Sequence, residues 1–81
     1  MSEYLEFKGW LLEQQNKVVE LRLKMHSLRE TIRMKLTLLE DIERLDTTTA
    51  AALAVELADK QITLKAMQAE IAAKKKAFGE V

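Results

Sequence analysis

Side chains suited to acid–base or metal chemistry are few in this sequence, and their spacing does not form a site. His26 is the only histidine, with Arg22 one helical turn before it and Glu30 one turn after it. One imidazole and one carboxylate supply too few ligands for a structural or catalytic metal. The sequence has no cysteine, no glycine-rich phosphate loop and no nucleophile elbow. We therefore predict a solvent-exposed His26 and no enzyme activity, with no catalytic residue, metal ligand or cofactor.

A basic stretch over residues 17–35 is the strongest charged feature. It holds six Lys and Arg residues against two Glu, and Arg22, Arg29 and Arg33 share a helical ridge with His26. Such a ridge can meet a row of phosphates. However, thirteen basic residues balance thirteen acidic ones, no nucleic-acid motif is present, and acidic residues later in the chain can lie across from the ridge. Binding of nucleic acid is therefore the less favoured alternative, and flanking charges of a coiled coil are the preferred interpretation.

Helices are expected to position these charged residues, because the composition favours helix over strand or turn. Ala, Leu, Glu, Lys and Met are abundant, proline is absent and only two glycines occur. Apolar side chains recur at alternating steps of three and four over residues 4–42 and 50–78. This spacing is typical of the seam of a coiled coil. Lys35, Lys60 and Lys74 fall on the same seams, and we expect their ammonium groups to reach solvent or a carboxylate.

A change in composition separates the two seams. Residues 1–49 contain no alanine, whereas residues 50–77 contain ten. Between the seams, residues 46–49 read Asp-Thr-Thr-Thr. Consecutive threonines disfavour a helix interior, and Asp or Thr can cap the helix that follows. A single rod-like helix, in which the four-residue offset between the seams forms a stutter, stays open as the alternative.

We predict an all-α fold, with residues 1–81 forming one domain that is an antiparallel two-helix hairpin of coiled-coil type. The expected elements are helix 1 at about 3–45, a turn at 45–49 and helix 2 at about 49–77. With this turn, position i would face about position 94 − i, and residues 1–12 would project beyond the end of helix 2.

A hairpin of this kind leaves apolar side chains without an intramolecular partner. Tyr4, Phe7 and Trp10 would lie on the projecting end, where Phe78 covers part of them. A second stripe on helix 2, opposite its seam, comprises Ala52, Val55, Asp59, Ile62, Ala66, Ala69 and Ala73, of which all but Asp59 are apolar. Small residues in such a stripe permit close approach of another helix. We predict that both groups bind a partner, and that two hairpins pair into a four-helix bundle.

The expected function is non-enzymatic assembly. The module would self-associate, with a dimer favoured, or bind a helical protein through its apolar stripes. In shape alone the hairpin resembles small bacterial hairpin chaperones and phage or secretion accessory proteins, and no residue role follows from that resemblance. The acidic start of the chain is unlike a secretory signal, and no apolar run is long enough to cross a bilayer. A cytoplasmic location is therefore expected.

Overall fold

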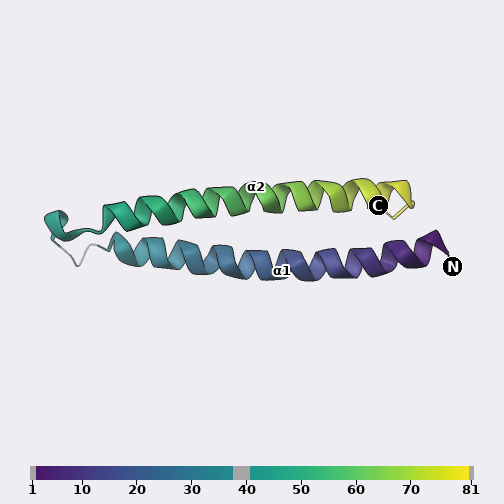
Figure 1. Ribbon diagram of the computed structural model, residues 1–81, viewed down its shortest axis with the longest axis horizontal. Helices are drawn as coiled ribbons and strands as arrows, with labels where there is room; N and C mark the ends of the chain where they lie inside the picture. Colours follow the sequence, from purple (N-terminus) through teal and green to yellow (C-terminus); the bar gives the residue numbers. More distant parts are fainter. Residues whose placement is uncertain (1, 38–40, 81) are drawn as a thin grey trace.

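The computed structural model describes residues 2–37 and 41–80. These residues form helix α1 (Glu3–Lys35), a short 3-10 helix η1 (Ile42–Arg44) and helix α2 (Thr47–Ala77), and they contain no strand. Figure 1 shows α1 and α2 lying side by side in opposite directions, with both termini at one end. The molecule measures 62 × 17 × 15 Å. The prediction of an all-α helical hairpin is confirmed, and the rod-like alternative is excluded.

Each long helix begins at a side-chain cap. Ser2 accepts a hydrogen bond from the backbone N–H of Tyr4 at 3.1 Å, and Asp46 accepts one from Thr49 at 3.1 Å. Such caps satisfy N–H groups that have no partner within the helix. Helix α2 starts at Thr47, two residues before the expected position, because Asp46 itself is the cap.

The C-terminal end of α2 is a Schellman turn built on Gly79. Gly79 has a φ of 74°, which glycine adopts without a steric penalty. Its N–H donates to the carbonyl of Lys76 at 3.1 Å, and the N–H of Glu80 donates to the carbonyl of Lys75 at 2.7 Å. This turn reverses the chain so that Glu80 can reach α1.

Helix α1 ends at Lys35, ten residues before the predicted end at 45. The seam predicted from periodicity was too long, because apolar residues at helical spacing also occur in the connection between α1 and α2. Ile42, a predicted seam residue, belongs to η1 and is 76 % exposed. A longer α1 would have no helix opposite it, since α2 begins at Thr47, so extending it would bury little. The predicted seam residue Leu39 lies outside the described residues.

The earlier end of α1 shifts the register between the helices by about ten positions from the predicted one. Phe7 stacks on Phe78, Lys74 lies over Trp10, and Lys35 forms an ion pair with the cap residue Asp46. The N-terminal residues of α1 therefore lie against the C-terminal end of α2. The prediction that residues 1–12 project beyond α2 is wrong, because it assumed a turn centred on residue 47.

Burial along the seam is mostly partial. Among the described residues only Phe7, Leu11 and Ala50 are buried. The other apolar seam residues between these points are half-buried: Val18, Leu21, Met25, Leu28, Ile32, Leu53, Leu57, Leu64, Met67 and Ile71. In a hairpin each seam residue is covered by the facing helix from one side only, so a single hairpin has a thin core.

The seam lysines follow the prediction at two of three positions. Lys35 and Lys60 are half-buried, and their ammonium groups reach Asp46 at 3.6 Å and Glu56 at 3.7 Å. Lys74 instead is exposed, and Lys75 takes the half-buried place. The reason is that Lys74 lies on the Trp10 side of the hairpin, with its Nζ atom 4.2 Å from the ring centroid.

Spin labels test this register. Gln15 and Gln68 line the same groove between α1 and α2, so labels at these two positions should be close. A label pair at Gln15 and Lys76 should be farther apart, because Lys76 lies eight residues, or about 12 Å, beyond Gln68 along α2. Double electron–electron resonance on labelled chains diluted in unlabelled ones measures both distances. A shorter distance for Gln15–Lys76 would instead support the longer α1.

Candidate functional site

The four aromatic residues form one intramolecular cluster at the open end of the hairpin. Phe7 and Phe78 stack with ring centroids 4.4 Å apart and planes 10° apart. Trp10 and Tyr4 flank Phe7, with centroids at 6.2 Å and 6.4 Å. Phe7 is only 4 % exposed, and Trp10 is half-buried. Of the three aromatics predicted to bind a partner, only Tyr4 is exposed, at 43 %, because the shifted register places Phe78 against them.

A polar group closes the aromatic cluster on its outer side. The Tyr4 hydroxyl donates to Glu80 Oε1 at 2.9 Å, and the Lys8 ammonium forms an ion pair with the same carboxylate oxygen. The hydrogen bond from Lys8 lowers the pKa of Glu80, with a further contribution from Tyr4. The hydrogen bond to Glu80 in turn raises the pKa of Lys8. This group could not be found from the sequence, because Tyr4, Lys8 and Glu80 meet only in the observed register between α1 and the end of α2.

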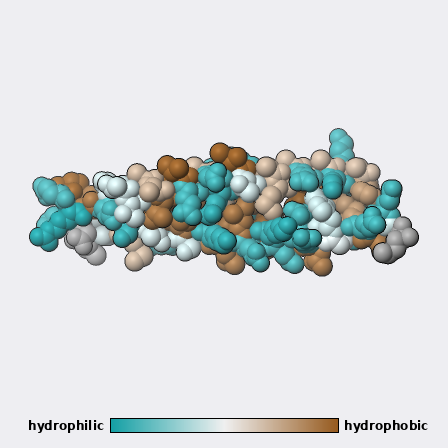
Figure 2. Space-filling model, in the orientation of Figure 1, coloured by the Kyte–Doolittle hydropathy of each residue, from teal (hydrophilic) through white to brown (hydrophobic). Residues whose placement is uncertain are grey.

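Two outer stripes of apolar side chains face away from the seam. On α2 the predicted stripe is exposed throughout, and Val55 and Ile62 are 71 % and 69 % exposed. On α1 a matching outer stripe consists of Leu5, Leu12, Val19, Leu23 and Met34, all exposed. Figure 2 shows apolar side chains at the edge over α2 and at the edge over α1, among polar ones. Each helix thus presents apolar surface on the side that its neighbour does not cover.

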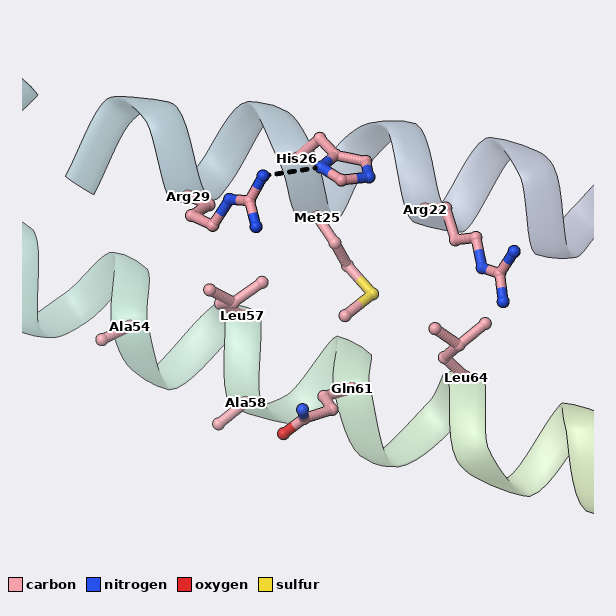
Figure 3. Close-up of a pocket in the computed structure, with 9 residues that line it drawn as sticks. All are labelled: Arg22, Met25, His26, Arg29, Ala54, Leu57, Ala58, Gln61 and Leu64. Atoms are coloured by element: carbon pink, nitrogen blue, oxygen red, sulfur yellow. Dashed lines mark hydrogen bonds between the residues drawn. The ribbon is translucent and has the colours of Figure 1, made fainter. Parts of the chain in front are cut away.

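A basic groove runs along one side of the hairpin, with a volume of about 470 Å³. Its lining residues are Arg22, Met25, His26 and Arg29 from α1, and Ala54, Leu57, Ala58, Gln61 and Leu64 from α2. Figure 3 shows Met25 reaching from α1 toward Leu57 and Leu64, which form an apolar floor. The Arg29 guanidinium lies within hydrogen-bond distance of Nδ1 of His26, at 3.2 Å from its Nη2 atom. Exposed His26 agrees with the prediction.

The three arginines of the predicted ridge differ in whether they form an ion pair. Arg33 donates to Glu30 Oε2 from both Nε and Nη2, at 3.1 Å and 2.9 Å. Arg22 and Arg29 form no ion pair within residues 2–37 and 41–80. Acidic side chains do not line the groove wall opposite them, where Ala54, Ala58 and Gln61 lie instead. The sequence alone could not show this, because it depends on which face of α2 meets the ridge.

Neither a metal centre nor a bilayer-spanning helix is found among the described residues. No group of three or more His, Asp or Glu side chains in this part of the chain is placed to hold a metal ion. None of its helices combines the length and the apolar character needed to cross a bilayer. Comparisons with models of known families, with curated proteins and with solved structures found no match. The two outer stripes and the basic groove are the surface features on which a function can be proposed.

The ionised groups at both ends of the hairpin predict how its stability depends on pH. Asp46 and Glu80 have lowered pKa values, through the backbone hydrogen bond from Thr49 and the hydrogen bond from Lys8. Their stabilisation is present above the ordinary values of 3.8 and 4.5 and is lost as pH falls through the lowered ones. Lys8 has a raised pKa, so its stabilisation is complete below 10.5 and is lost as pH rises through the raised value.

Thermal melts followed by circular dichroism should therefore show a plateau between these limits and a fall on each side. The variant Glu80→Gln should flatten the part of the alkaline fall that comes from Lys8, because its charged partner is gone. An unchanged alkaline fall in this variant would show that the pair with Glu80 does not stabilise the hairpin.

Proposed function

We propose that the chain is a non-enzymatic helical assembly module that associates through its outer stripes, most simply with a second copy of itself. The observation that carries this proposal is the exposure of large aliphatic side chains on both helices. Leu12 and Leu23 on α1 are 62 % and 65 % exposed, and Val55 and Ile62 on α2 are 71 % and 69 % exposed. Large apolar side chains exposed along one face of a helix are a feature of surfaces that bind partners.

The thin core supports the same proposal. Only three of the described residues are buried, so the hairpin alone removes little apolar surface from water. A second hairpin packed on the α2 stripe would cover Val55 and Ile62 on both copies at once. The alanines on either side of them, at 52, 66, 69 and 73, would permit the close helix approach of a four-helix bundle. Association of two hairpins would therefore bury apolar surface that a single seam leaves exposed to water.

The alternative role, as a nucleic-acid accessory protein, would use Arg22 and Arg29. Both lie on one groove wall and form no ion pair in the described part of the chain. A salt titration of binding separates the two roles, because phosphate contacts weaken steeply with salt and apolar helix packing does not.

The variant Ile62→Glu tests the assembly role. It places a charge in the middle of the α2 stripe, on the face away from the seam, so the hairpin itself should fold. The wild type should be a dimer at micromolar concentration by light scattering, and Ile62→Glu should weaken the dimer about tenfold or more, since a loss of about 1.4 kcal/mol has that effect. Gln68→Glu is the matched control, because it adds the same charge to α2 outside the stripe. A monomeric wild type with a sharp cooperative melt would refute the proposal.

A further inference from the structure

The basic groove differs in charge from the opposite side of the hairpin. On that opposite side Lys24, Glu56 and Lys60 line a second groove, and Lys60 pairs with Glu56 at 3.7 Å. Lys17, which precedes this groove on α1, pairs with Glu13 at 3.3 Å. Two of the three lysines on that side, Lys17 and Lys60, thus pair with carboxylates.

The arginines of the basic groove have no such neighbours. Arg22 and Arg29 face alanines and a glutamine across the groove, and neither forms an ion pair with a described residue. A further positive charge, Lys75, lines the adjoining groove on the same side, together with Gln15, Val19 and Gln68. The chain has no net charge, but Arg22, Arg29 and Lys75 line these two grooves and no Asp or Glu does. An acidic ligand would complement them.

The apolar floor of the groove favours one class of acidic ligand over another. Met25, Leu57 and Leu64 are half-buried and form an apolar strip below the arginines. A nucleic-acid backbone would pair with the arginines but would leave this strip without an apolar partner. A helix with an apolar face and an acidic flank matches both parts of the groove.

The two walls also suit a helix. Ala54 and Ala58 are one turn apart on α2, and their small side chains let another helix approach closely. Arg22 and Arg29 stand about 10 Å apart along α1, since two turns separate them. Guanidinium groups bind carboxylates through paired hydrogen bonds, so they can accept acidic side chains spaced two turns apart on the incoming helix.

We propose that the basic groove binds an amphipathic, acidic helix of another protein. This inference rests on the proposed role in helical assembly and adds a second surface and the chemistry of its partner. The groove is separate from the α2 outer stripe, because Val55 and Ile62 are not among its lining residues.

A designed peptide serves as the probe. It has about 20 residues, enough to span the groove as a helix, with leucines on one face and glutamates beside them. Fluorescence anisotropy should show binding to the wild-type chain. Two control peptides should not bind: one with lysine in place of each glutamate, and one with glutamine in place of each leucine.

Matched double variants locate the binding. Arg22→Glu/Arg29→Glu should weaken the peptide complex about a hundredfold, because each reversal turns attraction into repulsion. Lys17→Glu/Lys24→Glu lowers the net charge by the same four units on the other side and should change the affinity less than about threefold. Circular dichroism checks that each variant is folded. If the arginine variant loses its helix, Arg22→Gln/Arg29→Gln replaces it, with an expected loss of about tenfold.

Several results would overturn the proposal. Absence of peptide binding to the wild type, or equal weakening by the two double variants, would remove the groove as a specific site. Tighter binding of a 20-nucleotide DNA than of the peptide, lost in the arginine variant, would assign the groove to nucleic acid. Dissociation of a dimer by the arginine variant would assign it to a second copy. Ile62→Glu should bind the peptide as the wild type does, so failure of the groove and failure of the outer stripe are distinguishable.

Discussion

A pair of helices has a single face in common, and this geometry limits what the chain can bury. Phe7 and Leu11 near one end and Ala50 near the other are buried. At the open end Phe78 and the Schellman turn at Gly79 cover the seam, in addition to the facing helix. Along the middle nothing further covers it, and seam residues such as Met25 and Leu57 are half-buried. The grooves on either side of the seam and the apolar outer stripes both follow from this limit.

Polar groups at the two ends hold the helices in register. Asp46 caps α2 and pairs with Lys35, the last residue of α1, so one carboxylate connects both helices beside the turn. At the other end Glu80 receives the Tyr4 hydroxyl and the Lys8 ammonium. Each pair is partly exposed to solvent, and pairs of this kind contribute little to stability individually. Their importance lies in position, because a shift of either helix would separate both pairs as well as the Phe7–Phe78 stack.

The distribution of charge gives this neutral chain two different sides. Arg22 and Arg29 face small residues on α2, whereas Lys24 and Lys60 share a groove with Glu56. The apolar outer stripes lie on the remaining two faces, one on each helix. Under the two proposals above, a second copy would bind through one face and a different helix through another. The two kinds of association depend on different forces, apolar burial and charge complementarity, so salt affects them differently.

The sequence by itself determined the helical class, the apolar periodicity of both helices, an Asp or Thr cap before helix 2 and the exposure of the α2 stripe. These are local properties, set by helix propensity and by the 3.6-residue period. Only the tertiary structure decided that α1 ends at Lys35, and hence which residues face each other. That end depends on contacts far apart in the sequence, and seam patterns repeat every heptad, so several registers satisfy the same periodicity. For this reason Tyr4, Phe7 and Trp10 were correctly recognised as a group but wrongly placed beyond α2. Likewise, the arginine ridge was found in the sequence, while the alanines opposite it were decided by the register.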